Sequence, residues 1–267
     1  PEVRALLGDA RALRDRGLFH ALQCLGDAVV SGTPQVIVLD DVHWADEASL
    51  DFIEHLQRQA ADWPLLLVLA TRPPLFERRP GWAPPAPQRQ RMDLSPLDAA
   101  QSAALAGALL QCLPERPADL VQRIAGSADG NPYFVEEMVN MLVDRGALDL
   151  RQGRWMPERL QALELPTTLV GVLQARLAAL PTPQRRPLQL AAVAGAVFWD
   201  AALAELDAGA PAALTELQAR ELVQPREASR LTWAREYAFR HHTLHRVAYE
   251  GVLRSVRRPA CRPAHRW

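Results

Sequence analysis

The sequence contains no lysine, so all 30 of its basic residues are arginine. Any mechanism that needs a lysine of this chain is therefore excluded. Cysteine is scarce as well: Cys24, Cys112 and Cys261 are scattered and odd in number, which does not indicate a disulfide framework. This cysteine usage fits a reducing compartment, and we expect a cytoplasmic protein.

Long apolar runs are also missing. The longest uninterrupted run covers residues 65–70, whereas a membrane-spanning helix needs about 20 apolar residues. The sequence thus predicts no transmembrane helix, and its first residues do not resemble a signal peptide. The 30 basic and 31 acidic residues nearly balance, which argues against a chain that binds a polyanion along its whole length. With 267 residues there is room for two domains and a small third one.

The first part of the chain has the pattern of an α/β layer. Residues 36–39 read VIVL, a short apolar run typical of a strand buried on both faces of a parallel sheet. A helix is predicted over 47–61, with Asp46 placed to cap it, and residues 65–70 form a second buried strand. This order is typical of a doubly wound α/β fold. Apolar residues at helical spacing predict one more helix over 4–30.

A proline-rich stretch follows, because seven of the 22 prolines lie between Pro73 and Pro96. We expect a loop or linker there. Helices are predicted at 97–113 and 118–127, and a third begins at Asn131 and ends before Gly146. The remaining elements are a turn between short strands at 149–155, three or four helices within 166–220, a strand pair within 222–240 and a last helix at 241–257. Helices followed by a hairpin suggest a winged-helix unit, so the predicted fold class is α/β followed by all-α.

Asp40 and Asp41 follow the first predicted strand directly. In open α/β sheets, ligands bind at the carboxyl ends of the strands, and carboxylate oxygens suit Mg²⁺. Successive side chains of a strand point in opposite directions. One acid can therefore hold a metal ion while the other orients a water molecule. The alternative is a strand that ends in two solvated acids.

The same segment continues as VHWADEASL over residues 42–50. It resembles the Walker B segment of the signal-transduction ATPases with numerous domains (STAND). More narrowly, it resembles the AAA-type, origin-recognition-like ATPase module of large bacterial regulators, which is found fused to adenylate cyclase, kinase or LuxR-type DNA-binding domains. The family pattern Asp-Asp-x-His-Trp-Ala-Asp-x-x-Ser-Leu is matched at every fixed position. The resemblance implies a P-loop NTPase sheet in which Asp40 associates with Mg²⁺ and Asp41 polarises water. For Trp44 and Asp46 we expect structural roles, Trp44 as a core residue and Asp46 as a helix cap.

Two further segments resemble parts of this family. Thr71-Arg72, after the second strand, resembles the sensor-1 position, where an arginine reaches the terminal phosphate of the nucleotide. Pro73 favours an extended Arg72, which would direct it past the sheet edge; the alternative is an ordinary surface arginine. Gly130-Asn131-Pro132 resembles the Gly-x-Pro motif of the helical lid, which implies that Pro132 packs near the adenine base. A helix cap alone also explains that segment.

The segment from Phe239 to His241 resembles the end of the family's winged-helix domain. This resemblance implies that His241 contacts the β-phosphate of bound ADP. The sequence departs from the usual pattern here with His242, His245 and Arg246. His241 and His245 also have an i, i+4 spacing that zinc ligands can have, but no acid or cysteine accompanies them, so packed or solvated histidines are favoured.

The phosphate loop Gly-x-x-x-x-Gly-Lys-Ser/Thr of such an NTPase is missing from the sequence. We therefore expect a fragment that lacks the Walker A loop, binds ATP poorly and hydrolyses it negligibly. The resemblance divides the chain into the C-terminal part of a P-loop NTPase core at 1–95, a helical lid at 96–165, a winged-helix-like domain at 166–258 and a disordered tail at 259–267.

The resemblance implies an ATP- and Mg²⁺-dependent switch that controls a fused or associated signalling output, such as transcription, with ATP and ADP as ligands and self-association as a further interaction. A degenerate ATPase that acts as a protein scaffold is the alternative. DNA binding is the third reading and is disfavoured: the basic stretch 240–267, with seven arginines and one acid, is better explained as a solvated tail. Because parallel strands with open apolar edges aggregate, we expect the chain to be poorly soluble or to depend on a partner.

Overall fold

The computed structural model describes residues 34–252, apart from 60–62, 83, 85, 115–117, 228 and 230. The chain divides into two compact units, Pro1–Leu94 and Ser95–Trp267. The boundary lies close to the predicted end of the first domain at residue 95. Two predictions, the helix over 4–30 and the tail at 259–267, lie outside the described residues.

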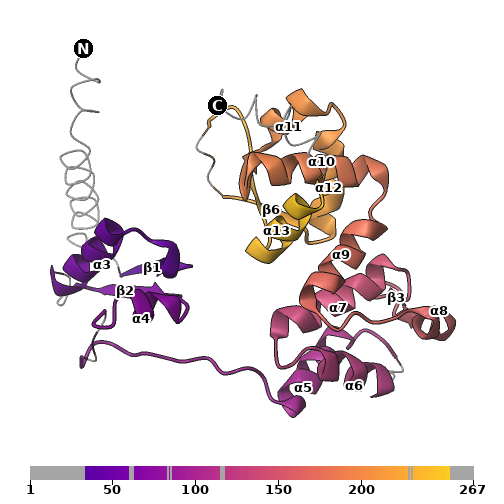
Figure 1. Cartoon of the computed structure of the whole chain (residues 1–267), viewed down its shortest axis with the longest axis horizontal. Helices are drawn as coiled ribbons and strands as arrows, with labels where there is room; N and C mark the ends of the chain where they lie inside the picture. The colour runs from indigo at the N-terminus through magenta and orange to yellow at the C-terminus, as the bar shows by residue number, and fades with distance from the viewer. Residues whose placement is uncertain are drawn as a thin grey trace. The chain divides into compact units, whose positions relative to one another are not determined.

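The first unit is built on two parallel strands, β1 (Gln35–Leu39) and β2 (Leu65–Leu69), which pair in register from Gln35↔Leu65 to Leu39↔Leu69 (Figure 1). They are connected by a 3₁₀ turn, η1 (Val42–Trp44), and by helix α3 (Glu47–Gln59). The predicted strand–helix–strand order is confirmed. Asp46 caps α3 as expected, because its Oδ1 accepts a hydrogen bond from the Ser49 amide at 2.7 Å.

One face of this small sheet packs on α3. Leu39, Leu67 and Leu69 lie against a core of residues that are at most 5 % exposed: Val42, Leu50, Ile53, Leu75 and Trp82. The opposite face carries Val36 and Val38, which are 63 % and 65 % exposed, and Leu66 and Val68 share it. In the described part of the chain, the prediction of strands buried on both faces is therefore wrong. An apolar run predicts the strand, but other segments decide whether its second face is covered.

The proline-rich stretch is not loop throughout. Pro74–Arg78 form a short helix, α4, with proline in its first turn, and the buried Leu75 anchors it in the core of the first unit. Proline is compatible with the first turn because the amide it lacks has no partner in the helix there. The prediction of a loop over 73–96 is thus wrong at its start, because prolines in the first turn of a helix do not interrupt it.

The first half of the second unit is a cluster of three helices, α5 (Ala99–Leu109), α6 (Ala118–Ser127) and α7 (Pro132–Asp144). Asn131 caps α7 as predicted: its Oδ1 accepts a hydrogen bond from the Phe134 amide at 3.3 Å. Gly146, at φ 66°, follows the helix and takes the left-handed conformation that terminates it. The predicted hairpin is present as β3 (Leu148–Asp149) and β4 (Arg154–Trp155), and helix α8 (Pro157–Ala162) follows.

The second half contains four helices, as expected from the sequence: α9 (Leu169–Ala179), α10 (Thr182–Ala194), α11 (Asp200–Leu206) and α12 (Ala210–Ala219). The predicted strand pair is β6 (Val223–Pro225) and β7 (Glu236–Phe239), and the last helix, α13, covers His242–Glu250. An unpredicted strand, β5 (Val197–Trp199), completes an antiparallel sheet of order β5-β7-β6. The fold is thus mixed α/β: the second unit is mainly helical but not all-α.

The helices of the described part were compared with the length and apolarity that a membrane-spanning helix needs. None of them is long and apolar enough to cross a bilayer.

Candidate functional site

The carboxyl ends of β1 and β2 lie at the same edge of the sheet, because the two strands are parallel. The chain beyond each strand stays paired: the Ala70 amide donates to Leu39 O at 2.9 Å, and the Val42 amide donates to Ala70 O at 3.0 Å. Asp40 and Asp41 leave β1 at this edge, and Thr71-Arg72 leave β2 beside them. The structure thus brings together the acids and the arginine that the sequence singled out in the first unit.

Asp41 has an unusual backbone conformation. Its φ of 53° and ψ of 37° are left-handed, which is uncommon for residues other than glycine but is tolerated by aspartate. Its amide donates to Asp40 Oδ1 at 2.8 Å, and its carbonyl accepts from the Trp44 amide at 2.9 Å. The chain therefore turns sharply after β1, and both carboxylates are exposed at the turn.

The structure of the turn η1 contradicts the prediction that Trp44 is a core residue. Val42 points into the core at 4 % exposure, whereas Trp44 is 72 % exposed, so the assignment of Trp44 to the core is wrong. Because the chain turns left-handed at Asp41, the buried position falls on Val42. Trp82 supplies the buried indole of this unit.

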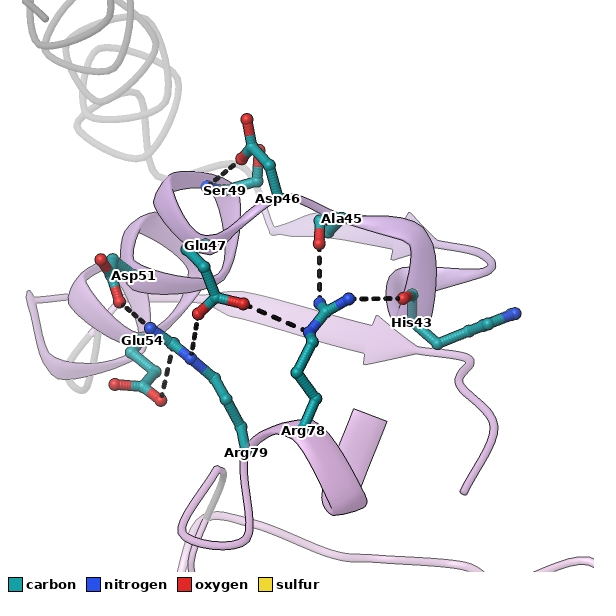
Figure 2. Close-up of polar contacts among 9 residues, drawn as sticks. All are labelled: His43, Ala45, Asp46, Glu47, Ser49, Asp51, Glu54, Arg78 and Arg79. Atoms are coloured by element: carbon teal, nitrogen blue, oxygen red, sulfur yellow. Dashed lines mark hydrogen bonds and ion pairs between the residues drawn. The ribbon is translucent and has the colours of Figure 1, made fainter. Parts of the chain in front are cut away.

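Arg78, at the end of α4, binds main-chain carbonyl groups of this turn (Figure 2). Its Nη1 donates to His43 O at 3.1 Å and its Nη2 to Ala45 O at 2.7 Å, while its Nε lies 3.2 Å from Glu47 Oε1. Arg78 thus connects the carboxyl edge of β1 with the start of α3. Sequence reasoning missed it, since its partners lie about 30 residues or more earlier and no local pattern indicates them.

Arg79 has different partners. Its guanidinium lies 2.7 Å from Glu47 Oε2 and 3.7 Å from Glu54 Oε1, and it also pairs with Asp51 (Figure 2). The hydrogen bond with Asp51 raises the pKa of Arg79 above its usual value, so this side chain stays charged. Arg79 therefore binds the acidic side chains of α3.

Two buried polar atoms near the sheet edge have no hydrogen-bond partner among the described residues: His43 Nδ1 and Thr71 Oγ1. The imidazole of His43 lies 3.7 Å from Asp41 Oδ1, too far for a hydrogen bond. Arg72 is exposed, and its guanidinium forms no ion pair with another residue in the described part. Unpaired polar groups beside two exposed carboxylates can accommodate a polar ligand.

Pro132 and His241 lie in the second unit. Pro132 opens α7 and His241 precedes α13, and the ring of Tyr133 stacks on that of His241 with centroids 3.8 Å apart. The starts of the two helices therefore lie next to each other. Burial raises the pKa of the Tyr133 phenol well above its usual value, so this ring stays neutral.

His245 is engaged in packing rather than presented as a ligand. One ring nitrogen, Nε2, lies 3.0 Å from Ala192 O, and the ring packs edge-on against Phe239. Burial lowers the pKa of His245 below its usual value. Among the described residues, no group of three or more His, Cys, Asp or Glu side chains is arranged to hold a metal ion by itself.

Comparison with known proteins shows sequence similarity but assigns no family or function. No protein-family model matches the chain. An uncharacterized protein of Rhizobium meliloti (strain 1021) is 30 % identical over 263 residues, which cover 93 % of this chain and 24 % of the relative. The chain thus spans about a quarter of the length of the curated relative it matches.

Proposed function

We propose that this chain is part of an ATP-binding, ATP-hydrolysing switch module of a signal-transduction or transcription-regulating ATPase of the STAND/AAA type. The observation that carries the proposal is the pair Asp40–Asp41 at the carboxyl end of a parallel strand, with Thr71 and Arg72 just after the neighbouring strand. This is the edge at which open α/β sheets bind ligands.

The donor set at this edge fits Mg²⁺. This ion is usually bound by one or two carboxylates together with water and substrate phosphates, which agrees with two exposed aspartates and no larger cluster among the described residues. Asp40 would hold the ion, which when bound would neutralise phosphate charge. Asp41 would orient water, and the unpaired Thr71 Oγ1 and His43 Nδ1 supply further polar groups.

The phosphates would be contacted by Arg72, whose exposed guanidinium has the planar geometry that suits phosphate oxygens. For the second unit taken by itself, the family resemblance implies that Pro132 is a contact for adenine and His241 a contact for the β-phosphate, and both assignments are part of this proposal. The sequence supplies no Gly-x-x-x-x-Gly-Lys-Ser/Thr loop, so this chain alone binds ATP weakly and turns it over negligibly. A P-loop NTPase sheet, a helical lid and a winged-helix-like domain belong to the same proposal.

The module would act in the cytoplasm on a fused or associated output domain, with self-association as a further interaction. The second candidate is a degenerate ATPase that serves as a protein-interaction scaffold. The absence of lysine and of a phosphate loop in this chain supports it, whereas two acids and an exposed arginine at one sheet edge favour the switch.

Saturation-transfer difference NMR with ATP tests the proposal, because it detects ligands that bind weakly. We expect a transfer signal on ATP that requires Mg²⁺ and is lost in Asp40→Asn. The matched control is Asp93→Asn, which removes an exposed carboxylate that pairs locally with Arg91. A signal that is the same with and without Mg²⁺ and in all three proteins would favour the scaffold.

A further inference from the structure

The guanidinium of Arg78 binds the backbone of the turn η1, which is remote from it in the sequence. Two of its three nitrogens donate to main-chain carbonyls, those of His43 and Ala45, and the third pairs with Glu47 (Figure 2). The two carbonyls bracket the end of the turn η1, one within it and one just after it. A planar fork that binds both fixes their spacing and orientation together.

The turn in question determines where the acids lie. Asp41 is left-handed, and its carbonyl accepts the Trp44 amide at 2.9 Å, while the Ala45 amide donates to Val42 O at 3.0 Å. These two hydrogen bonds close the turn, and the Arg78 contacts lie on the carbonyls next to them. The left-handed conformation is less favourable for aspartate than for glycine, so contacts of the surrounding chain help to hold Asp41 in it.

We propose that Arg78 is a positioning residue: by binding the carbonyls of His43 and Ala45, it holds η1 in the shape that keeps Asp41 left-handed and its carboxylate at the carboxyl edge of β1. The geometric part of this inference concerns the apo protein. Its consequence for Mg²⁺ and ATP rests on the proposed function.

Arg79 provides a matched control. It is the next residue, carries the same charge and pairs with three carboxylates of α3, those of Glu47, Asp51 and Glu54. None of its contacts in the described part involves the carbonyls of η1. Arg79→Met therefore removes a comparable charge and several ion pairs without removing the fork that spans the turn.

The test compares Arg78→Met, Arg78→Lys and Arg79→Met in the full chain. Backbone chemical shifts of Asp41 report its conformation, and hydrogen exchange of the Trp44 and Ala45 amides reports closure of the turn. We expect Arg78→Met to move Asp41 out of the left-handed region and to speed exchange of both amides about tenfold or more. Arg78→Lys should give an intermediate result, because an ammonium can bind one carbonyl but cannot reproduce the planar fork.

Arg79→Met should leave the shifts of Asp41 and both exchange rates unchanged. The inference is overturned if Arg78→Met leaves the Asp41 shifts as they are, or if Arg79→Met changes them equally, since the arginines would then only stabilise the unit in general. If Arg78→Met does not fold, Arg78→Lys decides on the same two readouts.

A second measurement tests whether the shape of the turn η1 affects binding of the metal ion and nucleotide at the carboxyl edge of β1. Mn²⁺ with ATP is the probe, and paramagnetic broadening of the Asp40 amide is measured. We expect less broadening in Arg78→Met than in Arg79→Met. If the unsubstituted protein shows no broadening, the proposed function fails, whereas the positioning role is still judged by the Asp41 shifts alone.

Discussion

Arg176 is a buried cation at the junction of three helices. It lies on α9, is 1 % exposed and uses every nitrogen of its guanidinium: Nη1 donates to Glu137 Oε2 at 2.6 Å, Nε to Asp144 Oδ2 at 2.8 Å and Nη2 to Arg220 O at 2.6 Å. Both carboxylates belong to α7, and Arg220 follows α12. Arg176 therefore joins the two halves of the second unit.

Replacing Arg176 by methionine would leave the buried Glu137 without its ion-pair partner, whereas Asp144 would keep Arg220, whose Nη1 lies 2.6 Å from Asp144 Oδ1. Burial already raises the pKa of Glu137, and the charge of Arg176 opposes that rise. Removing one partner of a buried ion pair costs about 3–5 kcal/mol. In a unit of this size, that loss lowers Tm by roughly 10 °C.

Thermal and urea unfolding followed by circular dichroism measure this effect. The control is Arg186→Met, which breaks an exposed pair with Asp207 and should cost at most about 1 kcal/mol. Adding Glu137→Gln to Arg176→Met should recover part of the loss, because the stranded charge is removed. A Tm shift of Arg176→Met no larger than that of Arg186→Met would show that the buried ion pairs of Arg176 do not stabilise the second unit.

Three further predictions concern single positions. Burial lowers the pKa of His245 below its value in the unfolded chain. The stability that this residue contributes is therefore present above about pH 6.5 and is lost as the pH falls toward the folded-state pKa. In urea unfolding at pH 7.5 and 5.5, the free energy of unfolding should depend less on pH in His245→Gln than in the unsubstituted protein. Asp46→Ala removes the cap of α3 and should lower the free energy of unfolding by about 1 kcal/mol, as measured in urea. An unchanged free energy of unfolding would show that the cap does not stabilise the helix. Gly130→Ala places a Cβ against Leu97 O at φ 71° and should lower stability by more than about 1 kcal/mol, whereas Gly126→Ala, where nothing lies within 4 Å, should not.

Local chemistry was sufficient to predict most of the elements and some of their ends. The apolar runs at β1 and β2, the cap at Asp46 and the pair Asn131 and Gly146 around α7 each depend on neighbours within a few residues. Such features can be read from a sequence because the same residues that specify them also form them.

Features that depend on tertiary contacts were missed. Trp44 is apolar yet exposed, because the left-handed Asp41 rotates the turn that carries it. Arg78 acts on carbonyls that only the fold brings near it. For Arg176 a signal did exist: it occupies the apolar face of α9, three and seven residues after Leu173 and Leu169, where a charged residue implies a buried partner.

The proposed function requires that the carboxyl edge of β1 and β2 binds a metal–nucleotide complex. Paramagnetic NMR with Mn²⁺ and ATP tests it most directly, because broadening identifies the amides nearest the ion even when binding is weak. We expect broadening that is confined to residues around Asp40, Asp41 and Thr71, depends on ATP and is abolished in Asp40→Asn. Broadening spread over the acidic surface of α3, around Asp51 and Glu54, or unchanged in Asp40→Asn, would contradict it.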